Sequence, residues 1–122
     1  MKYLSLIMLF FGLVACAESQ ESTAKDTYSD AVLIDVRTPQ EFKQYSPEGS
    51  INIPVDNIAS NEQVLPQNKD TKIVVFCLSG GRSSHAKFIL EEMGYKNVIN
   101  GGTFRNVAEV LEQEKELKKS KG

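Results

Sequence analysis

The segment CLSGGRS, residues 77–83, has the composition of an anion-binding loop with a thiol at its centre. Adjacent glycines let the backbone adopt conformations that are closed to other residues, so successive N–H groups can point inward. A helix that starts near Ser83 presents unpaired N–H groups and the positive end of its dipole, and Arg82 adds a permanent charge. The residues expected to contact a bound anion are Leu78, Ser79, Gly80, Gly81, Arg82 and Ser83.

Cys77 is the expected nucleophile, and its reactivity depends on how far the loop lowers the pKa of its thiol. A free cysteine has a pKa near 8.5, and lowering it by about two units requires roughly 2.7 kcal/mol. A helix terminus supplies roughly 0.3–1 kcal/mol, or about 2 kcal/mol where it is partly buried. We therefore expect Arg82 and the inward N–H groups to supply the rest. The alternative is an inert core cysteine at a strand end, which would need no glycine-rich loop.

Other residues near this loop have simpler interpretations. Asp35 and Arg37 follow an apolar run, where they could support the loop, but an ion pair between Arg37 and Glu41 that stabilises the turn is the plainer expectation. His85 is expected to be a partly exposed spectator rather than a proton shuttle. Phe88 is expected to be an exposed aromatic residue that could contact a partner.

The loop must be positioned by strands, which the sequence marks as short apolar runs. Residues 31–35 (AVLID) and 72–76 (KIVVF) have the pattern of strands buried on both faces. Shorter strands are expected at 49–54 and 97–99. Cys77 directly follows the most apolar of these runs, at the edge of the sheet where ligands of parallel α/β folds bind.

Helical patterns alternate with these runs. A first helix should begin after Thr38, which can form a capping box with Glu41, and should end near Tyr45. A second should extend from the loop to Gly94, a residue suited to the left-handed position after a helix. The final helix should carry one apolar stripe, formed by Val107, Val110, Leu111 and Leu117. The alternation predicts an α/β fold, with a mainly parallel sheet flanked by helices.

Composition excludes several functional classes. The formal net charge of −2 argues against a general nucleic-acid binder, which would present a basic face. Two cysteines and one histidine are too few for a structural zinc site, and they also make a disulfide scaffold unexpected. We expect no metal and no cofactor.

The first residues have the pattern of a signal peptide. Lys2 precedes an apolar stretch, residues 4–14, that is shorter than the roughly 20 residues of a membrane span. An uncleaved membrane anchor is the alternative. Residues 13–16, LVAC, resemble the lipobox of bacterial lipoproteins, which implies cleavage before Cys16 and a lipid on its side chain; cleavage after Ala17 also fits the residue types. Ala17 after the cysteine favours the outer membrane.

Cleavage before Cys16 would divide the chain into three parts. Residues 1–15 are the expected signal peptide, residues 16–30 a polar tether, and residues 31–122 the folded domain. The domain would then lie on the periplasmic side of the bacterial cell envelope, held to the outer membrane by its lipid.

Five segments together resemble the rhodanese family, and within it the small periplasmic single-domain form. They are IDVR at 34–37, GSINIP at 49–54, CLSGGRS at 77–83, EMGY at 92–95 and the glycine pair at 101–102, in family order. The resemblance implies a three-layer rhodanese-like fold and a sulfurtransferase reaction. Cys77 would attack the outer sulfur of thiosulfate, release sulfite and become a persulfide, which cyanide, a cellular thiol or a protein then accepts.

The chain also departs from this family. Many members have Gly-His-Ile where this chain has residues 45–47, YSP, and a tryptophan where it has Asn106. An opening strand and helix that are common in larger members are replaced by the polar tether. These differences concern packing at the edge of the domain more than the loop.

Two other functions remain open from the sequence. Phosphatases and arsenate reductases also use a cysteine in an anion-binding loop, but they resemble one another in having five residues between cysteine and arginine, where this chain has four. Phe76 also replaces the histidine that often precedes the cysteine in tyrosine phosphatases. The second alternative is a non-enzymatic module that binds a partner or senses sulfur or oxidants. Turnover of thiosulfate and cyanide to thiocyanate would distinguish an enzyme from a sensor.

Overall fold

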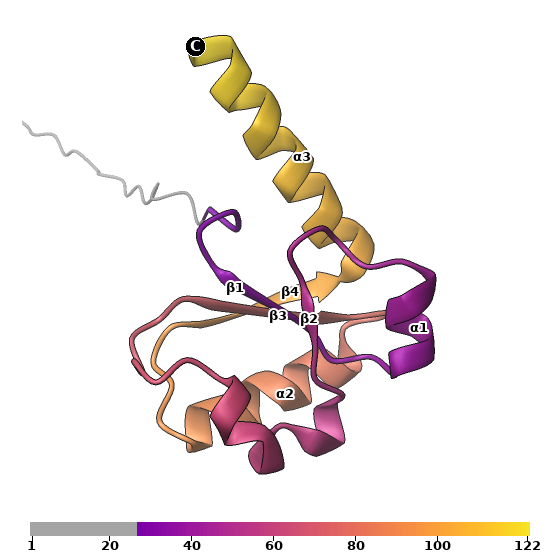
Figure 1. The fold of residues 1–122 in the computed structure, drawn as a ribbon, viewed down its shortest axis with the longest axis vertical. Helices are drawn as coiled ribbons and strands as arrows, with labels where there is room; N and C mark the ends of the chain where they lie inside the picture. Colours follow the sequence, from indigo (N-terminus) through magenta and orange to yellow (C-terminus); the bar gives the residue numbers. More distant parts are fainter. Residues whose placement is uncertain (1–26) are drawn as a thin grey trace, which may run out of the picture.

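The computed structural model describes residues 27–122, which form a parallel sheet with helices on both faces (Figure 1). Its strands are β1 (Val32–Asp35), β2 (Ile51–Asn52), β3 (Ile73–Cys77) and β4 (Val98–Thr103), in the spatial order β2-β1-β3-β4. All the pairings are parallel. The α/β fold with a parallel sheet that the sequence predicts is therefore confirmed.

The two faces of the sheet are covered by different helices (Figure 1). On one face lie α2 (Gly81–Glu92) and the short 3-10 helices η1 (Val55–Asn57) and η2 (Ala59–Val64), which the sequence analysis did not predict. On the other face α3 (Phe104–Lys121) packs through Val107. The central strand β3 is buried along its whole length and sends residues to both cores, with Cys77 on the face of α2.

The connection after β1 forms as predicted. Thr38 caps α1 (Pro39–Gln44): its side chain accepts from the N–H of Glu41, and the Glu41 carboxylate accepts from the N–H of Thr38 at 3.0 Å. Pro39 occupies the first turn, where its missing N–H is no loss. The helix ends at Gln44, before the segment YSP. This capping box fixes the direction in which the Glu41 carboxylate points.

The last strand differs from the prediction, because β4 continues through both glycines instead of ending at residue 99. A bulge causes the difference: Val75 pairs with Asn100, whereas Phe76 pairs with Gly102, so Gly101 is the extra residue. Gly101 is buried, and a Cβ there would lie 2.7 Å from a methyl carbon of Val107 in α3. The glycine lets α3 approach the sheet closely.

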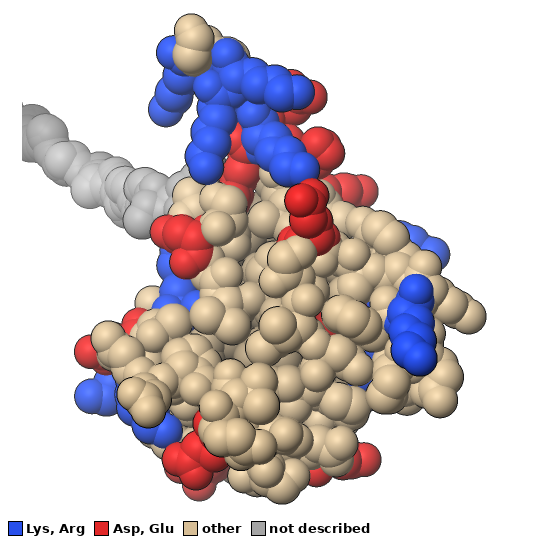
Figure 2. All heavy atoms as spheres, viewed as in Figure 1, with Lys and Arg blue, Asp and Glu red and all other residues tan. Residues whose placement is uncertain are grey.

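The predicted apolar stripe of the final helix is only partly correct. Val107 is fully buried and Leu111 packs against the core, but the side chain of Leu117 is 53% exposed. The reason is visible in Figure 1, where the end of α3 extends well beyond the sheet and away from the two cores that the described residues form. Lysines surround this projecting end (Figure 2), and Lys118, Lys119 and Lys121 lie in the last turn, where positive charge complements the helix dipole.

The start of the described chain is attached to α3. The carboxylate of Glu114 accepts hydrogen bonds from the backbone N–H groups of Tyr28 and Ser29, at 2.7 and 2.9 Å. The Lys72 ammonium contacts the Thr27 carbonyl at 3.0 Å and the Asp30 carboxylate at 3.1 Å. The end of the expected tether, residues 27–30, therefore contacts the domain.

The expected signal peptide, the lipobox and both possible cleavage positions lie outside the described residues. Within residues 27–122, no helix has both the length and the apolar composition needed to span a bilayer.

The close approach at Gly101 gives a test of the fold. Gly101→Ala should destabilise the protein by about 1–3 kcal/mol, because the added methyl group would overlap the buried side chains of Val107 and Val74. Gly81→Ala is the matched control, since a Cβ at Gly81 meets nothing within 4 Å, and its effect should stay within about 0.5 kcal/mol. Urea unfolding followed by circular dichroism measures both. Equal stability of the two variants would contradict the packing described here.

Candidate active site

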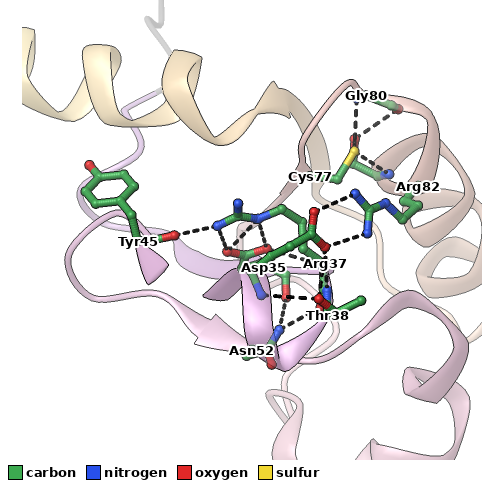
Figure 3. A network of polar contacts seen from close by, with 10 residues as sticks. Asp35, Arg37, Thr38, Tyr45, Asn52, Cys77, Gly80 and Arg82 are labelled. Atoms are coloured by element: carbon green, nitrogen blue, oxygen red, sulfur yellow. Dashed lines mark hydrogen bonds and ion pairs between the residues drawn. The ribbon is translucent and has the colours of Figure 1, made fainter. Parts of the chain in front are cut away.

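Cys77 is the last residue of β3 and lies at the carboxyl edge of the sheet, as the sequence predicts. The residue is fully buried. The backbone turns over its sulfur at Gly80, which has a φ of 100° and caps the start of α2 (Figure 3). This left-handed conformation is strained for residues other than glycine, which explains the need for glycine at this point of the loop.

The loop directs its hydrogen-bond donors at the sulfur. The N–H of Gly80 lies 2.9 Å from the Cys77 Sγ and the N–H of Ser83 lies 3.4 Å away. The Cys77 S–H donates to the Ser83 hydroxyl oxygen at 3.5 Å, and in the thiolate this hydroxyl becomes the donor. Burial is the largest single influence on the Cys77 pKa and raises it, but it is outweighed by hydrogen bonds from the Ser83 hydroxyl and from the N–H groups of Ser83, Gly80 and Ser79. The pKa of the Cys77 thiol is therefore lowered, as expected for a reactive cysteine.

The Arg82 side chain is paired with the carboxylate of Glu41 and is not one of the groups that hydrogen-bond the Cys77 sulfur. Its guanidinium forms a two-pronged ion pair with Glu41, with N–O distances of 2.9 and 3.3 Å. The hydrogen bond to Glu41 is the main influence that raises the pKa of Arg82, and the Cys77 charge contributes less. The sequence predicts a large share for Arg82 in ionising the thiol. In the structure Glu41 offsets much of the Arg82 charge, so the hydrogen bonds to sulfur are the stronger influence.

The predicted ion pair between Arg37 and Glu41 is wrong. Arg37 pairs instead with Asp35, at 2.7 Å, and both side chains are almost fully excluded from solvent. Because Asp35 is buried and only two residues away, it captures the guanidinium, which leaves Glu41 free to reach Arg82 across the turn. The pKa of Glu41 is lowered to about 2, chiefly by its hydrogen bond from Arg82 and then by the Thr38 N–H.

The pair of Asp35 and Arg37 fixes the segment around α1 (Figure 3). The Arg37 guanidinium donates to the Tyr45 carbonyl at 2.6 Å and lies 4.1 Å from the centre of the Phe104 ring. The Ser46 hydroxyl donates to Asp35 at 2.8 Å. These contacts connect β1, the end of α1 and the start of α3. Among the described residues, neither side chain bonds the loop itself, so the predicted support of the loop stays a prediction that would act through the position of α1.

One residue that contacts the loop was not identified from the sequence. The side-chain oxygen of Asn100, at the β4 bulge, lies 2.8 Å from the Ser83 hydroxyl and accepts the N–H of Gly102 at 2.9 Å. An asparagine before two glycines usually indicates a turn, so no sequence pattern indicates that Asn100 contacts the loop. The pairing of β4 with β3 brings Asn100 to Ser83.

The remaining residues singled out from the sequence lie at the surface. Leu78, next to Cys77 in the loop, is 46% exposed, and Ser79 is also exposed. His85 and Phe88 are exposed on α2, which agrees with the exposure predicted for both, while their predicted roles stay predictions. The sulfur is therefore surrounded by backbone donors and one hydroxyl, with uncharged side chains at the tip of the loop.

Known proteins of one family are similar to this chain over most of its described residues. The sequence model of the rhodanese-like domain family matches residues 18–104 of this chain. The thiosulfate sulfurtransferase PspE of Escherichia coli is 37% identical over 75 residues, which cover 62% of this chain and 72% of that protein. A sulfurtransferase of Allochromatium vinosum is 33% identical, covering 69% of this chain and 76% of its own length. A solved rhodanese with anions from E. coli, 36% identical, has a TM-score of 0.61 and covers 64% of this chain and 92% of its own. The chain belongs to the rhodanese-like domain family.

Proposed function

We propose that this protein is a sulfurtransferase that moves sulfur from thiosulfate or a similar donor to a thiophilic acceptor, with Cys77 carrying the sulfur as a persulfide. The observation that carries the proposal is the ring of donors around a buried sulfur, with the Gly80 N–H at 2.9 Å and the Ser83 N–H at 3.4 Å. Membership of the rhodanese-like family and similarity to a relative named as a thiosulfate sulfurtransferase support the same chemistry.

The first half-reaction forms the persulfide. The Cys77 thiolate attacks the outer sulfur of thiosulfate, a bond forms between the two sulfur atoms, and the bond from the outer to the central sulfur breaks. The electron pair leaves with sulfite. Because sulfite departs as an anion, the step needs no general acid. Backbone donors therefore suffice, and the exposed His85 has no required part in it.

The second half-reaction returns the thiolate. Cyanide, a cellular thiolate or a protein thiolate attacks the terminal sulfur of the persulfide, and the electron pair of the breaking sulfur–sulfur bond returns to Cys77. Between the two steps the negative charge lies on the terminal sulfur, where it needs hydrogen-bond donors. We expect the N–H groups of Ser79, Gly80 and Ser83, which already bond the Cys77 sulfur, to supply these donors.

Arg82 and Glu41 control how the site receives an anionic donor. The guanidinium is the positive charge of the loop, but the Glu41 carboxylate already occupies two of its donors. A donor anion must share Arg82 with Glu41. The ion pair therefore limits the affinity for the donor while it fixes the first turn of α2 against α1.

The location of the protein forms the second part of the proposal. Cleavage before Cys16 and lipid attachment to that residue would hold the domain on the periplasmic side of the outer membrane, with residues 17–26 as the link to the attached segment at 27–30. Intact-mass analysis of the mature protein from bacterial membranes tests this. A lipid mass on a chain that begins at Cys16 supports the proposal, whereas an unmodified chain that begins at Glu18 contradicts it.

Persulfide formation can be measured directly. After incubation with thiosulfate, the wild-type protein should gain the mass of one sulfur atom, and Cys77→Ala should gain none, because no other described residue supplies the nucleophile. His85→Ala should behave like the wild type. Production of thiocyanate from thiosulfate and cyanide measures turnover of the same three proteins. A persulfide that forms but is never transferred would indicate a sensor.

The hydroxyl of Ser83 should contribute to the reactivity of the thiol. Ser83→Ala removes one hydrogen bond to the sulfur, which is worth about 0.5–1.5 kcal/mol and should therefore raise the Cys77 pKa by roughly 0.4–1.1. The pH dependence of iodoacetamide labelling of the Cys77 peptide measures this pKa. In the wild type the midpoint should lie below that of a free cysteine. A midpoint at or above the free value would overturn the account of the loop.

The charge of Glu41 should weaken donor binding. Glu41→Gln keeps an acceptor for the Thr38 cap but removes the negative charge that offsets Arg82, so the KM for thiosulfate should fall several-fold. Because the pKa of Glu41 is about 2, its carboxylate is ionised throughout the neutral range, and the effect should not vary between pH 6 and 8. Steady-state kinetics at several pH values test this. Glu62→Gln, at an exposed glutamate in η2, is the control, and an equal change in its KM would argue against a role for the ion pair.

A further inference from the structure

The Ser83 hydroxyl has one proton and several acceptors. The side chain is fully buried, and its oxygen lies 2.8 Å from the Asn100 amide oxygen, 3.0 Å from the Gly80 carbonyl and 3.5 Å from both the Gly102 carbonyl and the Cys77 sulfur. A hydroxyl donates only one hydrogen bond at a time in a well-aligned geometry. The shortest of these contacts is to Asn100, so the sulfur has a competitor for the proton.

Asn100 is fixed in the orientation that makes it this competitor. Its amide oxygen accepts the N–H of Gly102 at 2.9 Å, and its amide nitrogen donates to the Ser84 hydroxyl at 2.9 Å. The Ser84 hydroxyl in turn donates to the Gly80 carbonyl at 3.0 Å. Partners on both sides of the amide group leave its oxygen pointing at Ser83.

We propose that Asn100 is a positioning residue that competes with the Cys77 sulfur for the Ser83 proton and thereby sets how readily the thiol ionises. When Cys77 is a thiol, its S–H donates to the Ser83 oxygen, and the Ser83 hydroxyl donates to Asn100. When the thiolate forms, the Ser83 hydroxyl turns to the sulfur. The oxygen of Asn100 then keeps only the Gly102 N–H.

The same exchange would accompany sulfur transfer, a consequence that rests on the proposed function. In the persulfide the negative charge has moved to the terminal sulfur. The Cys77 sulfur is then bonded to its own Cβ and to the terminal sulfur, and it carries no charge. The Ser83 hydroxyl then gains more from Asn100 than from this neutral sulfur. Asn100 therefore favours the neutral forms of the Cys77 sulfur, both the thiol and the persulfide, over the thiolate.

The charged groups around the sulfur do not take part in this exchange. They are Arg82 on α2, Glu41 on α1 and the pair of Asp35 and Arg37 at the end of β1. His85, the titratable residue that follows on α2, is exposed. Within residues 27–122, the hydrogen bonds of the Ser83 hydroxyl and the Asn100 amide involve none of these groups. Substitution at Asn100 therefore changes the competition and leaves the local ion pairs in place.

Two substitutions at Asn100 should move the Cys77 pKa in opposite directions. Asn100→Ala removes the competing oxygen, so the pKa should fall by roughly 0.3–1. Asn100→Asp places a stronger acceptor and a negative charge at the same position, so the pKa should rise. The readout is the pH dependence of iodoacetamide labelling in the full chain, followed on the Cys77 peptide so that Cys16 does not contribute.

Repeating the Asn100 substitutions in the Ser83→Ala variant distinguishes two roles of Asn100: competition for the Ser83 proton, and simple structural support of the loop. In that background Asn100→Ala should no longer lower the Cys77 pKa, and the rise caused by Asn100→Asp should become smaller. Ser84→Ala is the structural control: it releases the other end of the amide but keeps the competing oxygen, so it should not reproduce the fall.

Three results would overturn the inference. The first is a Cys77 pKa that rises or stays constant in Asn100→Ala. The second is a fall of that pKa in Asn100→Ala that is just as large in the Ser83→Ala background. The third, where Asn100→Ala does not fold, is a rise of the Cys77 pKa in Asn100→Asp that is equal with and without the Ser83 hydroxyl. Because labelling reports the thiol alone, its outcome is independent of sulfur transfer. A protein with these pKa changes that forms no persulfide would refute the proposed function and leave this inference standing.

Discussion

A negatively charged sulfur at the buried end of a strand needs hydrogen-bond donors that are already in place. Cys77 is fully buried, and burial by itself raises the pKa of its thiol. The donors must therefore come from the chain, and the left-handed turn at Gly80 brings the N–H groups of Gly80 and Ser83 onto the sulfur. The remaining polar contacts of the site can be understood as the means by which this turn is held still.

Two supports act on neighbouring residues in the first turn of α2. From one side, the capping box of α1 directs the Glu41 carboxylate at Arg82, and the buried ion pair at the end of β1 fixes the segment that carries it. From the other side, the β4 bulge directs Asn100 at Ser83. The sheet joins the two supports, since β1 and β4 both pair with β3. The position of the donors is thus determined by three strands as well as by the loop itself.

The range of each interaction along the chain explains what the sequence could predict. The loop around Cys77 and the capping box between Thr38 and Glu41 are local, so residue types and spacing were sufficient. The partner of Glu41 is Arg82, 41 residues away, and local spacing wrongly suggested Arg37. Asn100 reaches Ser83 through a bulge, whose register depends on the fit of a glycine against buried valines in β3 and α3. Such a fit depends on packing between distant segments, which no local pattern contains.

The charge of the site is largely balanced within the chain itself. Glu41 offsets Arg82, and the exposed Leu78 and Ser79 at the tip of the loop are uncharged. An anionic donor therefore meets backbone dipoles and a guanidinium that is already paired. These dipoles are aimed at one sulfur position, so they act more strongly on the charge carried by Cys77 than on the charge of a donor outside the loop.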